Sequence, residues 1–115
     1  MGAKKPLWIM IAGPYGSGAK TQTAKDANLK ILNEAALKIF RMGHVPIVGV
    51  NNAQHLIALA GASGFDEIMM PLSLALSERC DCCLRIGGAS KGADEEVARF
   101  RARGKPVYFS IEEIG

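Results

Sequence analysis

The sequence lacks any apolar run long enough to span a membrane. Residues 7–12 (LWIMIA) follow two lysines, as the hydrophobic part of a signal peptide would, but Gly13 and Pro14 end the run too early. A short, continuous apolar run is typical of a strand that is covered on both faces. We therefore expect a buried strand here and a cytoplasmic protein with no membrane partner.

Cysteine is also scarce. The three cysteines, Cys80, Cys82 and Cys83, form one group, with no C-x-x-C pair and no second group. Adjacent strand residues point to opposite faces, so Cys82 and Cys83 are badly placed to share a metal ion. We expect buried, reduced thiols, no metal site and no cofactor, which again favours the cytoplasm.

An excess of one charge is missing as well. The 14 lysines and arginines against 11 acidic residues give a net charge of +3, spread along the chain, which does not predict nucleic-acid binding. The densest basic run, from Arg99 to Lys105, is interpreted as the solvated face of a helix. The 115 residues fit a single domain over 1–115.

What the sequence does contain is an alternation of apolar strands and amphipathic helices. Strands are predicted at residues 7–12, 45–50, 82–86 and 107–109, and helices at 21–42, 53–60, 66–79 and 91–103. Pro71 is expected in the first turn of the third helix. This order predicts an α/β fold: a small doubly wound, flavodoxin- or Rossmann-like parallel sheet of about four to five strands, with helices on both faces.

Two glycine-rich loops follow predicted strands: GPYGSG at 13–18 and GGASKG at 87–92. Sheets of this kind bind ligands beyond the carboxyl ends of their strands, so the two loops should meet at one site. The first loop nearly matches a phosphate-binding P-loop, but Ala19 separates Gly18 from Lys20. One extra residue turns a side chain by about 100° at a helix start, which argues against a nucleoside triphosphatase.

Glu96 breaks the pattern of the last helix. Ala93, Glu96, Val97 and Phe100 share one apolar stripe, so the carboxyl should face inward, where it needs partners or serves a site. Glu95 is expected to pair with Arg99 one turn later. A structural ion pair is the alternative for Glu96.

Ser90 and Gly92 lie at the start of the same helix. Exposed N–H groups beside a hydroxyl form a cradle for phosphate. The alternative for Ser90 is an ordinary helix N-cap.

These residues carry a resemblance to a known family. An apolar strand running into Ala12-Gly13-Pro14-Tyr15 is followed by Cys80-Asp81, a strand, Ser90-Lys91-Gly92-Ala93 with Glu96, and then Gly104-Lys105-Pro106-Val107. The pattern resembles the nucleoside 2-deoxyribosyltransferase superfamily, particularly its short bacterial and phage members. The S-x-G-x-x-x-E element is also shared with the related 5'-monophosphate deoxynucleoside N-glycosidases.

The resemblance implies an N-glycosidic bond hydrolase or transferase acting on a nucleoside or nucleoside 5'-monophosphate. The glutamate matching Glu96 is the catalytic nucleophile in that family, and the serine matching Ser90 contacts a 5'-phosphate. Substrate binding is expected from Gly13, Pro14, Tyr15, Asn51, Ser90 and Gly92. Asn52 and His55 follow the same strand as Asn51, although a lone histidine is more often a surface residue. The resemblance also implies a homodimer or a higher homo-oligomer.

One position departs from the family. An aspartate that positions the sugar and handles the proton of the leaving base is expected eight residues before Asp81, where this chain has Ser73. Asp66 and Glu67 are the nearest carboxylates in the sequence. Serine weakens the acid–base half of the reaction, so a non-catalytic nucleotide-binding or sensing module stays an alternative. A phosphoribohydrolase of the lysine-decarboxylase-like type is a third, although GGASKGADEE lacks the threonine of its G-G-x-G-T-x-x-E loop.

Overall fold

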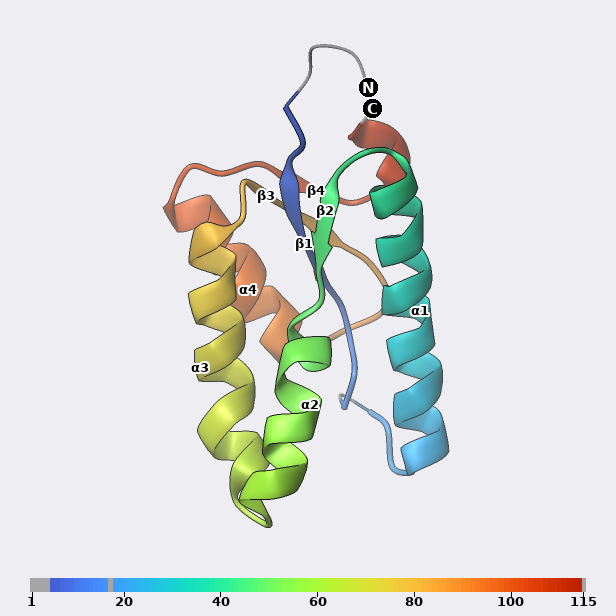
Figure 1. Ribbon diagram of the computed structural model, residues 1–115, viewed down its shortest axis with the longest axis vertical. Helices are drawn as coiled ribbons and strands as arrows, with labels where there is room; N and C mark the ends of the chain where they lie inside the picture. Colours follow the sequence, from blue (N-terminus) through green and yellow to red (C-terminus); the bar gives the residue numbers. More distant parts are fainter. Residues whose placement is uncertain (1–4, 17, 115) are drawn as a thin grey trace.

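The computed structural model describes residues 5–16 and 18–114. Its elements follow one another as β1 (Trp8–Ala12), α1 (Gln22–Arg41), β2 (Val45–Ile47), α2 (Gly49–Ala60), α3 (Gly64–Arg79), β3 (Cys82–Arg85), α4 (Lys91–Ala102), β4 (Val107–Tyr108) and the short 3₁₀ helix η1 (Ile111–Glu113) (Figure 1). The chain thus alternates strands and helices as the sequence predicts.

The strands form one parallel sheet in the order β2-β1-β3-β4. Ile9 pairs with both Pro46 and Cys82, and Leu84 pairs with Tyr108. The order reverses at β1, as it does in doubly wound folds, where the crevice beside the reversal binds ligands. The predicted fold class is therefore confirmed, with four strands.

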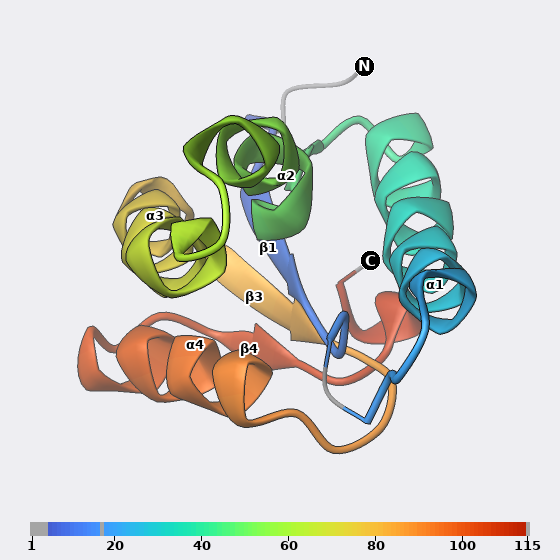
Figure 2. The same ribbon diagram turned by 90° about the horizontal axis from the view of Figure 1, so that it is seen from below.

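Helices cover both faces of the sheet (Figure 2). Helix α1 and η1 lie on one side, α3 and α4 lie on the other, and α2 packs along α3. The α2–α3 hairpin extends past the carboxyl ends of the strands, which elongates the molecule to 46 × 27 × 25 Å. Helices α2 and α3 therefore flank the region beyond the carboxyl ends of the strands.

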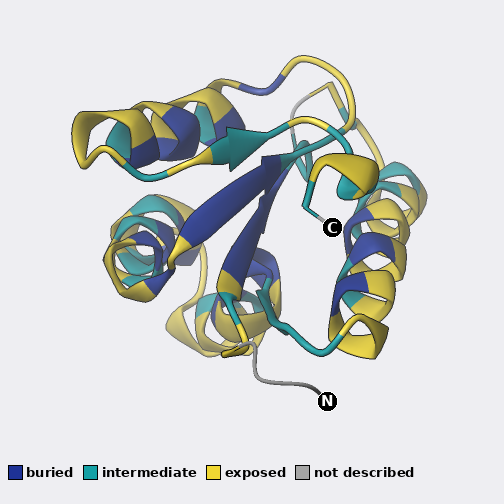
Figure 3. Cartoon of the chain, turned by 90° about the horizontal axis from the view of Figure 1, so that it is seen from above, coloured by how far each residue is buried: buried dark blue, intermediate teal, exposed yellow. Residues whose placement is uncertain are grey.

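The central strands are buried on both sides, and each helix buries one stripe (Figure 3). Ile9 and Ile11 of β1 belong to the core that includes α1, whereas Met10 and Ala12 join the core beneath α4. Cys82 and Cys83 divide between the same two clusters. Their predicted opposite orientation is confirmed, and it follows from the period of two in a strand.

The largest departures from the predicted boundaries concern β2 and the two helices that follow it, whereas the other boundaries differ by at most one residue. The strand expected at 45–50 ends at Ile47, and the helix expected from residue 53 already starts at Gly49. Glycine allows this early start: a Cβ at Gly49 would lie 2.2 Å from Ser73 Oγ of α3. Tertiary packing of α2 on α3 therefore overrides the strand propensity of the apolar run.

Helix α3 starts at Gly64, two residues before the expected start, and Pro71 lies inside it instead of in its first turn. A Cβ at Gly64 would lie 2.7 Å from the carbonyl oxygen of Ile57, so glycine permits the tight α2–α3 connection. The earlier start shifts the proline to the middle of the helix. Packing on α2 and α4 supports the helix past the backbone donor that proline lacks.

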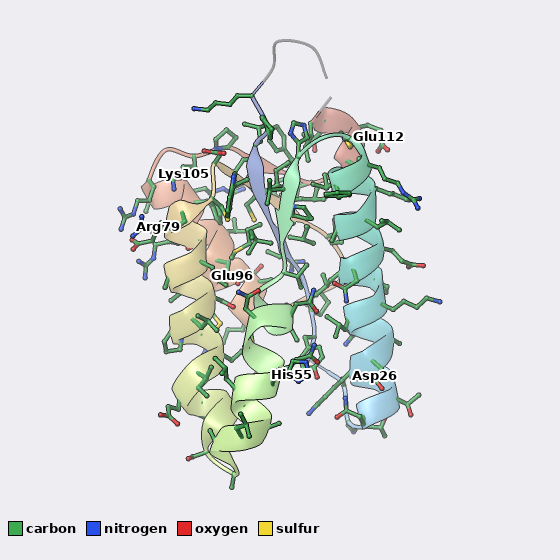
Figure 4. The ribbon with its side chains drawn as sticks, viewed as in Figure 1. Asp26, His55, Arg79, Glu96, Lys105 and Glu112 are labelled. Atoms are coloured by element: carbon green, nitrogen blue, oxygen red, sulfur yellow. The ribbon has the colours of Figure 1, made fainter. Side chains whose placement is uncertain are left out.

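The basic run at the end of α4 is only partly a solvated face. Arg99 and Arg103 both form ion pairs with Glu78 at the end of α3. Lys105 Nζ donates to the carbonyl oxygens of Glu78 and Cys80 at 2.9 and 2.8 Å, which satisfies groups that the helix end leaves open. These contacts tie α3 to α4 at the end opposite the candidate site (Figure 4).

Within residues 5–16 and 18–114, no helix is both long and apolar enough to cross a membrane.

Two phenylalanines provide a matched test of the core. Phe100 of α4 is 1% exposed, whereas Phe40 of α1 is 64% exposed. Phe100→Ala should lower the free energy of unfolding by about 3–5 kcal/mol through lost burial and a cavity, and Phe40→Ala by less than about 1 kcal/mol. Urea denaturation of both variants measures this. Equal effects would contradict the assigned packing.

Candidate functional site

A cavity of about 550 Å³ opens at the carboxyl ends of the strands, where the prediction placed the ligand. The two glycine-rich loops and the first turns of α2 and α4 surround it, and α3 forms one wall. The lining includes Gly13, Tyr15, Gly16, Lys25, Gly49, Val50, Phe65, Met69, Met70, Ser73, Ser90, Lys91, Gly92, Glu95 and Glu96.

The two glycine-rich loops meet, as expected. A Cβ at Gly13 would lie 2.7 Å from the carbonyl oxygen of Ile86, so only glycine lets the loop after β1 approach β3 this closely. Gly87 has a φ of +79° and packs against the Pro14 ring, which a Cβ would approach to 2.8 Å. Pro14 therefore packs against the second loop outside the cavity lining, whereas Gly13 and Tyr15 line the cavity.

Ser90 caps the start of α4 and also lines the cavity. Its side-chain oxygen accepts from the amide of Ala93 at 3.2 Å, so the N-cap interpretation is confirmed. Lys91 and Gly92 form the first turn of the helix and line the same cavity. The positive end of the helix dipole thus faces the space, which favours an anionic or electron-rich group there.

Glu96 is the buried carboxyl of this cavity. It is 8% exposed, on the same stripe of α4 as Ala93, Val97 and Phe100, so the predicted inward orientation is confirmed. In Figure 4 it lies at the centre of the molecule, where α2, α3 and α4 come together. Burial raises the pKa of Glu96 from 4.5 to about 7 because the charged form loses its water.

Two groups partly offset this effect of burial. The Ser73 hydroxyl and the Arg85 guanidinium both lower the pKa of Glu96, whereas the neighbouring Glu95 raises it. Arg85 is held in place by the loop that follows it: it donates to the carbonyl oxygens of Ile86 at 2.5 Å and Gly88 at 2.8 Å, and pairs with Asp94 at 3.4 Å. The guanidinium therefore fixes the second loop and supplies positive charge near Glu96.

Ser73, which stands eight residues before Asp81, has its hydroxyl facing Glu96. The residue is fully buried in α3 beside Gly49. Ser73 Oγ has no hydrogen-bond partner of standard geometry among the described residues, although it favours the charged form of Glu96. The position singled out in the sequence by its spacing from Asp81 is therefore next to Glu96, and it carries a hydroxyl instead of a carboxyl.

Several candidate residues lie outside the cavity lining. Asn51 is exposed, and its side-chain nitrogen donates to Asn33 Oδ1 of α1 at 2.6 Å. Asn52 and His55 are exposed on α2, and Asp66 and Glu67 are exposed in the first turn of α3. None of these five lines the cavity.

The predicted pair of Glu95 with Arg99 does not form, because Arg99 pairs with Glu78. Glu95 instead contributes to the cavity wall at an exposed position. The P-loop residues are not in the site either: Lys20 is exposed, and the Thr21 hydroxyl caps α1 by accepting from the amide of Ala24 at 3.1 Å. Both facts agree with the register error in that motif.

The sequence patterns did not predict that apolar residues of α3 line the cavity. Phe65, Met69 and Met70 line the cavity, yet apolar residues on a helix signal only burial. Lys25 of α1 also lines it, one turn after the cap, where a charged side chain gives no distinguishing signal. These residues give the site an apolar wall beside its charged ones.

The cysteines take no part in the cavity. Burial raises the pKa of Cys80 and Cys82 to about 11 and that of Cys83 to about 12, so they are protonated thiols. In the part of the chain that the structure describes, no group of three or more histidine, cysteine or acidic side chains is placed to hold a metal ion.

Comparisons with known proteins do not assign the chain to a family: no protein-family model matches it, and no curated protein matches its sequence.

The buried carboxyl makes stability depend on pH. Because its pKa is raised on folding, the folded chain binds more protons than the unfolded chain between about pH 4.5 and 7, so stability falls as the pH rises through this range. Glu96→Gln removes that cost. The variant should gain about 1–3 kcal/mol in free energy of unfolding near pH 8 relative to the wild type, and gain far less near pH 4.

Urea denaturation at several pH values measures this difference. The exposed neighbour provides the control, since Glu95→Gln should change stability little at any pH. A gain for Glu96→Gln that is the same at every pH would show that the carboxyl is not held in a destabilised charged form.

Proposed function

We propose that the protein cleaves or exchanges the N-glycosidic bond of a nucleoside or nucleoside 5'-monophosphate, with Glu96 as the nucleophile. One observation carries the proposal: a buried carboxyl lines a cavity of about 550 Å³ at the carboxyl edge of a parallel sheet, beside the first turn of α4. Perturbed carboxyls in clefts are typical of catalytic sites.

The proposed reaction has two steps. A Glu96 carboxylate oxygen bonds to the anomeric carbon while the carbon–nitrogen bond breaks, and the electron pair leaves with the base. Water, or a second base in an exchange reaction, then bonds to the same carbon, and the ester bond to Glu96 breaks to release the carboxylate. The proton that the incoming group loses balances the proton that the departed base takes up from solvent. Ser73 and Arg85 favour the charged form of Glu96 that the first step requires.

The lining suggests how the substrate lies. The sugar and any phosphate are placed against Ser90, Gly92 and Lys91 at the start of α4, with Lys25 of α1 adding positive charge. The base is placed against the apolar side chains of Phe65, Met69 and Met70. Tyr15 and Gly13 complete the sugar side of the site.

A nucleotide-binding module without turnover is the second candidate. It is favoured by Ser73, because the hydroxyl beside Glu96 replaces a group that would supply a proton. Binding of a nucleotide without release of its base would support this alternative.

We also propose that the protein is a cytoplasmic homo-oligomer. Phe65 at the cavity, together with Leu56 and Leu59 of α2, exposes apolar surface at the end of the molecule that carries the site. The three buried, protonated thiols fit a reducing compartment. The molar mass of the native protein in solution, measured by light scattering, tests the oligomer.

The enzymatic proposal is tested with common nucleosides and their 5'-monophosphates, ribo and deoxy, by chromatography of the released base. Glu96→Gln should lower turnover by at least about a thousandfold, since it removes the nucleophile. The control is Glu112→Gln in η1, at the far end of the molecule (Figure 4), which should retain wild-type turnover. No release of base from any substrate by folded protein would overturn the proposal.

A further inference from the structure

The supply of protons in the cavity limits the leaving groups that it can expel. Glu96 is the one buried carboxyl in the described lining, and the proposed function uses it as the nucleophile. A base that leaves as an anion needs a proton from a positioned acid, a contribution of about 10²–10⁴-fold in rate. The question is therefore which other group could supply that proton.

The buried wall next to Glu96 offers only a hydroxyl. Ser73 is fully buried, and the adjacent residues of α3, Met69 and Met70, carry no proton to give. An aliphatic hydroxyl donates a hydrogen bond but does not release its proton at neutral pH. The position that touches the nucleophile thus supports its charge and does not act as an acid.

The other proton-bearing side chains of the described lining are not positioned for this task. Glu95 and Lys91 are exposed, and Tyr15 and Lys25 are half-buried. No hydrogen bond or ion pair within the described residues holds any of these four side chains in place. A general acid must be held within hydrogen-bond reach of the atom that it protonates, so none of the four is placed to act as one.

The same lining suits a cation. The lining contains the carboxyls of Glu95 and Glu96, the aromatic ring of Phe65 and the thioethers of Met69 and Met70. Its two ammonium groups, Lys25 and Lys91, are assigned above to the sugar and phosphate. Aromatic faces attract cations, and methionine sulfur is soft and polarisable. A positive base would also favour the charged form of the buried nucleophile.

We propose that the substrates are nucleotides whose base is positively charged, so that it leaves as a neutral molecule without general acid catalysis. This proposal rests on the proposed function and narrows its substrate class. A Glu96 oxygen bonds to the anomeric carbon, the carbon–nitrogen bond breaks, and its electron pair neutralises the base. Water then bonds to the same carbon, the ester to Glu96 breaks, and one proton passes to the solvent.

Two pairs of matched substrates test the proposal. The first is guanosine 5'-monophosphate against the same nucleotide methylated at ring nitrogen N7, and the second is nicotinamide mononucleotide against its neutral dihydro form. The charged member of at least one pair should have a kcat/KM at least about 100-fold higher than its neutral partner, the contribution that an absent acid would have made.

The pH profile and two variants separate this account from a hidden acid. For nicotinamide mononucleotide, whose pyridinium ring has no proton to lose, kcat/KM should rise as Glu96 ionises and then stay level, with no fall at high pH. Tyr15→Phe and Glu95→Gln should each change kcat/KM by the same factor for the charged and the neutral substrate of a pair. A variant that lowers kcat/KM for the neutral substrate only would identify the substituted residue as a general acid and overturn the inference.

The outcomes also separate the inference from the proposed function. If neutral nucleotides have a kcat/KM within about 100-fold of the charged ones in both pairs, or are the only ones cleaved, the proposed function stands and the inference fails. If folded protein cleaves no nucleotide of either kind, both fail.

Discussion

The free energy needed to bury the charged carboxyl of Glu96 is the main constraint on this structure. Glu96 takes a place on α4 where an apolar residue would pack without penalty, and the fold surrounds it with Ser73 of α3 and Arg85 of β3. Their two effects reduce the cost of the charge without removing it, so the pKa of the carboxyl stays near 7. Near neutral pH the folded chain therefore loses stability by keeping this carboxyl in its interior, and such a loss is typical of functional sites.

The architecture explains why the carboxyl lies where a ligand can reach it. Parallel strands direct the loops after β1 and β3 to one edge, and close glycine contacts, at Gly13 on Ile86 and at Gly87 on Pro14, hold those loops together. The α2–α3 hairpin extends past that edge and closes the space from the other side. Gly49 allows this closure by bringing the first turn of α2 against Ser73, next to Glu96.

Local sequence patterns predicted the parts of the fold and site that depend on periodicity. The period of two placed Cys82 and Cys83 on opposite faces, and the helical period turned Glu96 inward. The early end of β2 and the central position of Pro71 were missed, because both result from packing of α2 on α3. Phe65, Met69 and Met70 escaped notice for a similar reason: an apolar residue at a cavity wall has the same sequence signature as one in the core. The neighbour of Glu96 was found only by counting from a family pattern, and its contact is tertiary.

The most direct test of the central claim is the chemical identity of the intermediate. A nucleotide carrying fluorine at the sugar carbon next to the anomeric centre slows the second step and lets a glycosyl ester accumulate, which mass spectrometry of the digested protein can locate. The account predicts a sugar adduct on the peptide that contains Glu96, absent from Glu96→Gln. Release of base with no adduct, or an adduct on another side chain, would contradict the assignment of Glu96 as the nucleophile.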